Sequence, residues 1–67
     1  MKGDKMPVIH IDSNKLSRKQ KRELVKAITK VSSEIMKLPE NAITIIIREV
    51  EAEDVGLGGQ LLCDRDL

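Results

Sequence analysis

The sequence contains no phenylalanine, tyrosine or tryptophan, and only one cysteine and one histidine, among its 67 residues. Without aromatic side chains, any core must come from isoleucine, leucine, valine and methionine, and no platform exists for stacking nucleic-acid bases. The lone Cys63 excludes an internal disulfide, and one cysteine with one histidine excludes a recognisable zinc site. The lone thiol is typical of a reducing interior, so we expect a cytoplasmic protein. No apolar run reaches the roughly 20 residues of a membrane span, and we expect neither membrane nor nucleic acid as a partner.

The length of the chain predicts one small domain over residues 1–67, with residues 1–6 as a polar leader. A chain this short buries only about 60% of its unfolded surface. Small domains usually add disulfides, a metal or oligomerisation, and here self-association is the one that remains. The net charge of +1 points to no particular partner, although seven basic residues lie between Lys15 and Lys30.

The order of the apolar segments predicts a strand, a helix and a second strand. Residues 7–12 and 42–50 have the β-branched content of strands. Between them, Ser17 and Gln20 have the spacing of a capping box at a helix start. Strand, crossover helix and strand make a right-handed unit with parallel strands. One helix covers only one face of such a pair, so we expect another copy of the chain to cover the rest.

The predicted helix has one apolar side and one basic side. Leu24, Ile28, Val31 and Ile35 recur at helical spacing and predict the side that packs on the strands. Pro39 cannot continue a helix and predicts its end.

A glycine-rich segment at residues 55–62 follows the second strand. Gly56, Gly58 and Gly59 occupy three of four positions, which indicates positive φ or close backbone approach. The spacing fits neither a P-loop nor a dinucleotide fingerprint. We therefore expect a tight hairpin, which we place at a subunit contact.

Pro7 follows Met6 and opens the first predicted strand. A proline at a free N-terminus is a secondary amine, and α-amino groups titrate near pH 7.7–8.0, close to where a general base works best. Translation from Met6 followed by methionine removal would expose this amine. In the chain as written, the Pro7 nitrogen is an amide and has no basic lone pair, so the form that retains residues 1–6 is expected to be inactive or weakly active.

Four features of this chain occur together. They are the Met6–Pro7 start, the helix with Gln-Lys-Arg-Glu-Leu at residues 20–24, the isoleucine-rich strand ending in Arg-Glu-Val at residues 48–50, and Val-Gly-Leu-Gly-Gly at residues 55–59. In this combination the chain resembles the 4-oxalocrotonate tautomerase family of the small tautomerase superfamily, in particular its DmpI-like members. The resemblance implies a β-α-β subunit with a C-terminal hairpin, an α/β (α+β) fold. It also implies dimers that share a four-stranded sheet and, usually, a hexamer built as a trimer of dimers. The implied activity is cofactor-independent keto–enol tautomerisation of a small anionic 2-oxo or 2-hydroxy unsaturated acid.

The resemblance places the catalytic base at Pro7. The family's two arginines fall on Leu16 and Thr44, and its common aromatic residue falls on Val55. The candidate substrate-binding residues are therefore nearby cations together with the residue at the aromatic position: Arg48, Lys15, Arg18 and Val55.

Each candidate also has an ordinary structural interpretation. Lys15 and Arg18 can be the solvated start of a helix, since such side chains are mostly exposed. Arg48 can form an ion pair with Glu49, with Glu51 or with an acid of a neighbouring copy.

His10 lacks an orienting acid in the sequence and is expected to be a packed or surface imidazole, and Cys63 a small apolar filler. Two functions of different classes remain open. One is a proton-transferring isomerase that uses Pro7 as its base. The other is a non-catalytic oligomer of the same fold, in which residues 1–6 block that proline.

Overall fold

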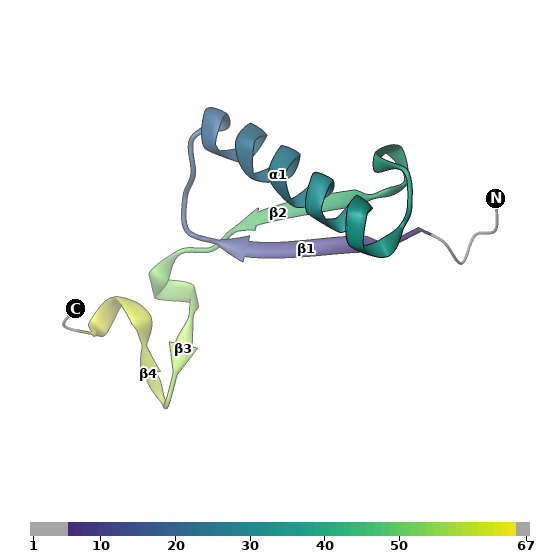
Figure 1. The fold of residues 1–67 in the computed structure, drawn as a ribbon. Coiled ribbons are helices and arrows are strands. Elements are labelled where there is room, and N and C mark those ends of the chain that lie inside the picture. Colours follow the sequence, from purple (N-terminus) through teal and green to yellow (C-terminus); the bar gives the residue numbers. More distant parts are fainter. Residues whose placement is uncertain (1–5, 66–67) are drawn as a thin grey trace.

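The chain folds as a strand–helix–strand unit followed by a small hairpin, and the computed structural model describes residues 6–65 of it (Figure 1). Strand β1 (Val8–Ser13) leads into helix α1 (Arg18–Met36), which returns the chain to strand β2 (Thr44–Glu49). The two strands are parallel neighbours, and α1 lies over one face of the pair (Figure 1). The predicted α/β fold with parallel strands and a C-terminal hairpin is confirmed. The predicted leader lies mostly outside the described residues.

The two faces of the strand pair differ in exposure. Residues on the α1 side are half-buried isoleucines, namely Ile9, Ile11, Ile45 and Ile47. On the other face the side chains are exposed, namely Val8, His10, Asp12, Thr44, Ile46 and Arg48. This six-residue surface is called the open sheet face below. Its alternation with the isoleucines follows from the two-residue period of a strand.

Helix α1 begins with a complete capping box. The Ser17 hydroxyl accepts a hydrogen bond from the Gln20 backbone N–H at 3.1 Å, and the Gln20 side chain accepts from the Ser17 N–H at 2.9 Å. The helix ends at Met36, and its C-cap Lys37 has a left-handed backbone with φ of 59°. A short 3₁₀ turn (Glu40–Ala42) then carries the chain past Pro39, so the second strand begins at Thr44 and not at residue 42 as predicted.

Replacing Ser17 with alanine is expected to lower the free energy of unfolding by about 1 kcal/mol per subunit, because one N–H at the helix start loses its acceptor. Chemical denaturation followed by circular dichroism measures this change. Ser17→Asp is the matched control, since a carboxylate also caps helices well. An alanine variant as stable as the aspartate variant would contradict the capping role.

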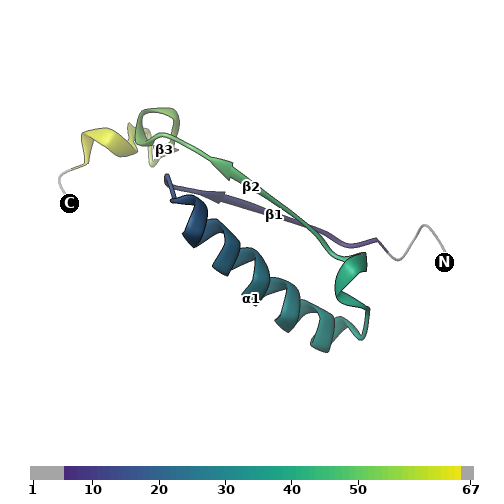
Figure 2. The same ribbon diagram turned by 90° about the horizontal axis from the view of Figure 1, so that it is seen from above.

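Only the first half of the predicted apolar stripe on α1 packs against the strands. Leu24 and Ile28 are half-buried, whereas Val31 is 52% exposed and Ile35 is 74% exposed. Seen from above, α1 diverges from the strands toward its C-terminal end, so its last turns lie beside the strands and not over them (Figure 2). The periodicity identified the apolar side correctly, but it carries no information on the angle between helix and sheet.

The C-terminal hairpin pairs β3 (Gly56–Leu57) with β4 (Gln60–Leu61) in antiparallel fashion. The two residues between them, Gly58 and Gly59, have φ of 63° and 84°. Positive φ at both loop positions is the pattern of a type I′ turn, which matches the twist of the flanking strands. The predicted tight hairpin is confirmed, and it projects away from the strand–helix–strand unit (Figure 1).

A single copy of the chain has no buried core among residues 6–65. Its radius of gyration is 15.6 Å, compared with about 11 Å for a compact domain of this length. Large apolar side chains remain exposed on α1 and on each of the four strands, including Val8, Ile35, Ile46 and Leu57 at 44–74%. The subunit therefore has the geometry of a part that needs neighbours to bury its apolar surface. Among the described residues, no helix is long and apolar enough to cross a membrane.

Candidate active site

Pro7 lies immediately before β1 and is half-buried. Its carbonyl oxygen accepts a hydrogen bond from the backbone N–H of Thr44 at 3.1 Å. This bond joins Pro7 to the first residue of β2, so the position of the proline is set by the start of the strand pair. A chain that began at Pro7 would carry its amine at this end of the sheet.

The three cationic candidates lie at the opposite end of the same subunit. Both strands run away from Pro7, and Lys15 and Arg18 follow β1 while Arg48 is the penultimate residue of β2. Five residues of strand separate Pro7 from the level of Arg48, which corresponds to about 17 Å at the usual rise per residue. Within one subunit the structure does not bring these cations to Pro7.

Val55 lies beyond β2, in the segment that leads to the hairpin, and is half-buried. Its carbonyl oxygen accepts a hydrogen bond from the Leu62 N–H at 2.7 Å, which closes the base of the hairpin. Its backbone thus has a structural role in the single chain that the sequence did not indicate.

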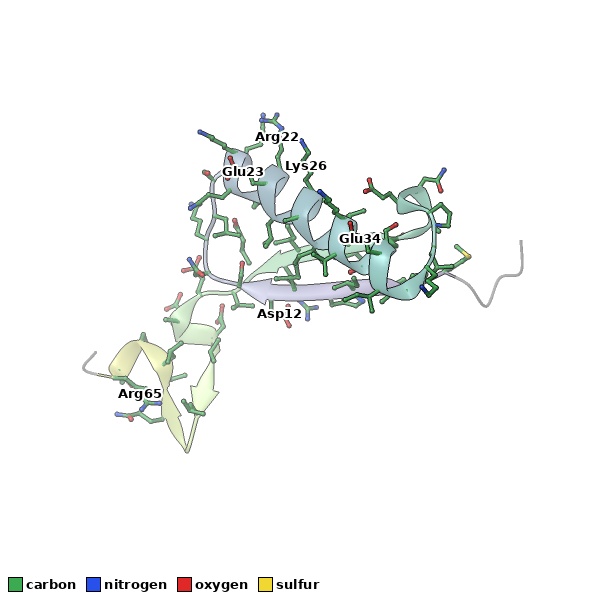
Figure 3. The ribbon with its side chains drawn as sticks, in the orientation of Figure 1. Asp12, Arg22, Glu23, Lys26, Glu34 and Arg65 are labelled. Atoms are coloured by element: carbon green, nitrogen blue, oxygen red, sulfur yellow. The ribbon has the colours of Figure 1, made fainter. Side chains whose placement is uncertain are left out.

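Arg48 forms an ion pair with Asp12 on the open sheet face. Its Nε donates to Asp12 Oδ1 at 2.8 Å, and its Nη2 donates to Oδ2 at 3.4 Å. The hydrogen bond from Arg48 is the largest cause that holds the pKa of the Asp12 carboxyl below its usual value. In the view with side chains, Asp12 lies on the side of β1 away from the helix (Figure 3).

The prediction that Arg48 forms an ion pair is correct, but within the subunit its partner is Asp12 and not Glu49 or Glu51. Glu49 follows Arg48 directly in a strand, so its side chain points to the opposite face. Asp12, in contrast, is the register partner of Arg48 in the parallel pair and lies on the same face. The sequence alone did not give this register, which depends on how the two strands align.

Glu49 makes a second set of charged contacts, which the sequence did not indicate. Its Oε2 accepts a hydrogen bond from the backbone N–H of Leu16 at 3.1 Å and lies 3.0 Å from Lys21 Nζ. The hydrogen bond from Lys21 is the main cause, and the Leu16 N–H the second, that lower the pKa of the Glu49 carboxyl. Lys15 adds a smaller attraction of the same sign. Glu49 therefore ties the connection between β1 and α1 to the end of β2.

The lowered pKa of Glu49 predicts a pH-dependent contribution to stability. The folded state binds this proton less readily than the unfolded state, so the contribution is complete above the ordinary pKa of 4.5 and is lost as pH falls through the lower folded value. The Tm of the parent chain should therefore fall more steeply than that of Glu49→Gln from about pH 5 downward. Thermal melts across this range measure the difference, and parallel curves would contradict it.

The remaining reactive side chains form no site by themselves. His10 is exposed on the open sheet face as the register partner of Ile46. Cys63 is exposed in the single chain, with its Sγ 3.8 Å from Asp64 Oδ1, so the prediction of an apolar filler is wrong at the level of the subunit. Within residues 6–65, no group of three His, Cys, Asp or Glu side chains could hold a metal ion.

Comparison with known proteins matches this arrangement to one family. A family model described as tautomerase enzyme matches residues 7–65. The crystal structure of DmpI from Archaeoglobus fulgidus is 45% identical over 87% of this chain and 100% of that chain, with a TM-score of 0.81. The structure of apo unFused 4-OT is 30% identical over 87% and 97%, with a TM-score of 0.79. TomN, a 4-oxalocrotonate tautomerase homologue in the tomaymycin biosynthetic pathway, is 25% identical over 88% and 92%, with a TM-score of 0.82.

Proposed function

Because the chain belongs to the tautomerase family, we propose that it is a cofactor-independent keto–enol tautomerase in which Pro7, when N-terminal, is the general base. The proposed substrate is a small anionic 2-oxo or 2-hydroxy unsaturated acid. One observation carries the proposal: the match to the family model begins at Pro7, which the fold holds at the start of the strand pair through its carbonyl.

The chemistry requires a base that can take up and release a proton near neutral pH. A free proline amine has an ordinary pKa of about 7.7–8.0 and carries no side chain that must be ordered. The amine removes a proton from the enol hydroxyl or from the carbon next to the carbonyl and returns one at the other position. The product is an isomer of the substrate, so no oxidant, reductant or leaving group takes part.

A complete site is proposed to form between copies of the chain. In one subunit Pro7 and the cations lie at opposite ends of the strand pair, and the level of Arg48 is about 17 Å along the strands from Pro7. When two such pairs join edge to edge about a two-fold axis perpendicular to the sheet, the adjoining strands are antiparallel. The Pro7 end of one copy then lies beside the Lys15 and Arg18 end of the next. We propose that a dimer with a shared four-stranded sheet provides this arrangement, and that three such dimers form a hexamer.

The proposed substrate carboxylate binds Lys15, Arg18 or Arg48 of a neighbouring copy, with Val55 as an apolar part of the lining. Arg48 already has Asp12 as its partner, so its positive charge is largely balanced within the subunit. Lys15 and Arg18 are exposed at the helix start, and they occupy the part of the chain that flanks the family's first arginine position at Leu16. These two cations are therefore the better-supported anion contacts.

The proposal is tested with protein that begins at Pro7, assayed by ultraviolet absorbance with 2-hydroxymuconate and with the enol of phenylpyruvate. Pro7→Ala, which keeps a primary amine, should lower kcat by about 100-fold, since a positioned base contributes 10²–10⁴-fold. Alanine at Lys15, Arg18 or Arg48 should chiefly raise KM. Lys26→Ala is the control for loss of one cation, because Lys26 points away from the strands on the outer side of α1 (Figure 3). Equal rates for the parent and Pro7→Ala would remove the proline from the mechanism.

A further inference from the structure

The connection between β1 and α1 carries Lys15 and Arg18, yet little in its own sequence holds it in place. The hydroxyl of Ser13 and the amide of Asn14 make hydrogen bonds only to the carbonyl of the following residue, which do not tie the connection to another element. The longer-range tie is the hydrogen bond from the Leu16 N–H to Glu49, a residue 33 positions away in the sequence. The backbone between Lys15 and Ser17 is thus placed by a carboxylate on another strand.

The position of Glu49 is itself well determined. Glu49 is the register partner of Ser13 in the parallel strand pair, and the next residue, Val50, donates its N–H to the Ser13 carbonyl at 2.9 Å. The carboxylate therefore projects from the last rung of the sheet toward the helix start. Its side chain is 34% exposed, so the carboxylate is partly shielded from solvent.

An acid beside an anion-binding segment would ordinarily repel the substrate. Here Lys21 lies 3.0 Å from the same Oε2 atom and balances its charge. Lys15, a proposed substrate-binding cation, is also close enough to lower the pKa of the Glu49 carboxyl, so the two charges attract each other. The arrangement provides an acceptor for a backbone N–H while it limits the negative charge near the site.

We propose that Glu49 is a positioning residue for substrate binding. It holds the 14–17 connection so that Lys15 and Arg18 face the carboxylate of a substrate bound at the Pro7 of a neighbouring copy. Lys21 neutralises the charge of Glu49. This inference rests on the proposed function for the identity of the ligand. It differs from a purely structural ion pair in one respect. For substrate binding, the acceptor oxygen of Glu49 is the feature that matters, and a negative charge so close to the substrate is tolerated only because Lys21 is present.

Three substitutions separate these two roles in protein that begins at Pro7. Glu49→Ala removes the acceptor and should raise KM for phenylpyruvate about tenfold, with kcat changed less than twofold. Glu49→Gln keeps an acceptor for the Leu16 N–H and should hold KM within about twofold of the parent. Lys21→Met leaves the carboxylate without its counter-charge and should raise KM about threefold to tenfold. Glu51→Ala, which removes one acid two residues away, is the matched control and should leave KM unchanged.

A second readout tests whether the effect is on the anion. The methyl ester of phenylpyruvate keeps the carbonyl and lacks the negative charge, so its KM should be insensitive to Glu49→Ala. If Glu49 were only structural, Glu49→Gln and Glu49→Ala would behave alike, and both substrates would lose kcat/KM together with a fall in Tm. That pattern would overturn the proposal.

Binding of cis,cis-muconate, a dicarboxylate without the reacting hydroxyl, separates this proposal from the proposed activity. Isothermal titration calorimetry should show an approximately tenfold weaker Kd for Glu49→Ala than for Glu49→Gln. If the parent chain turns over no substrate but the two Glu49 variants show this difference in Kd, the proposed activity is wrong and the positioning role stands. If the parent turns over substrate while Glu49→Ala binds muconate as tightly as Glu49→Gln, the positioning role is wrong. Failure of the parent to bind muconate at all would overturn it as well.

Discussion

Protein that begins at Pro7 is expected to tautomerise 2-hydroxymuconate about 10²–10⁴ times faster than the same chain with residues 1–6 attached. The reason is chemical. The nitrogen of Pro7 is an amide when Met6 precedes it, and an amide nitrogen has no lone pair basic enough to accept a proton. A free proline nitrogen is a secondary amine that titrates near neutral pH. The comparison is made by initial rates on the two proteins at equal subunit concentration.

A third protein, with a single glycine placed before Pro7, separates chemical from steric block. The added residue converts the proline nitrogen to an amide but is too short to fold over a site. If amide formation is the cause, the glycine-extended chain should be as slow as the full chain. If the glycine-extended chain is fast and the full chain slow, residues 1–6 obstruct the site and the base is another group.

The outcome also decides between the two functions that the sequence left open. Intact mass of protein isolated from its native source shows whether Pro7 is the first residue. A free Pro7 with activity supports the tautomerase. A native chain that retains residues 1–6 and lacks activity supports a non-catalytic oligomer of the same fold.

The second large effect is expected on assembly. Replacing Ile46 with aspartate should weaken self-association by at least about 100-fold and leave little folded protein at micromolar concentration. Ile46 lies near the middle of the open sheet face and is 44% exposed in the single chain, as expected for a side chain that a neighbour covers. The described part of the chain has no buried core that would keep an isolated subunit folded. An unpaired carboxylate on a covered apolar surface also costs several kcal/mol.

Sedimentation velocity with circular dichroism at matched concentrations measures both quantities. The parent chain should sediment as one species of six subunits, and the variant should be dissociated with reduced helical signal. Lys26→Asp is the matched control, since it introduces the same charge on the outer side of α1, where Figure 3 shows Lys26 pointing away from the strands. A folded monomer of either the parent or the Ile46 variant would contradict the need for neighbours.

Most of the local structure was predictable because it depends on residues close in sequence. Ser17 and Gln20 predicted the capping box, Pro39 predicted the end of the helix region, and the glycines predicted the hairpin turn. Each of these features is a short-range backbone effect, which is why a pattern of a few residues was sufficient. The same holds for the alternation of isoleucines in β2, which follows from the period of a strand.

The charged contacts at the far end of the sheet were not predictable in this way. Asp12 pairs with Arg48 across 36 residues, and Glu49 contacts Leu16 across 33. Each contact depends on the register in which two distant strands align, and a shift of one residue would move each side chain to the other face. The sequence placed Arg48 beside its neighbours in the chain, whereas the sheet placed it beside Asp12.

The sequence by itself determined the kind of subunit and the element order, and it supplied Pro7 as the proposed base. It did so because periodicity, caps and turns act within a few residues, and because the family motifs are contiguous. Only the tertiary structure decided that Pro7 and the cations Lys15, Arg18 and Arg48 lie at opposite ends of one subunit, and that the last turns of α1 leave Val31 and Ile35 uncovered. The direction of parallel strands and the angle between helix and sheet are properties of packing between segments distant in the chain, and no local pattern contains them.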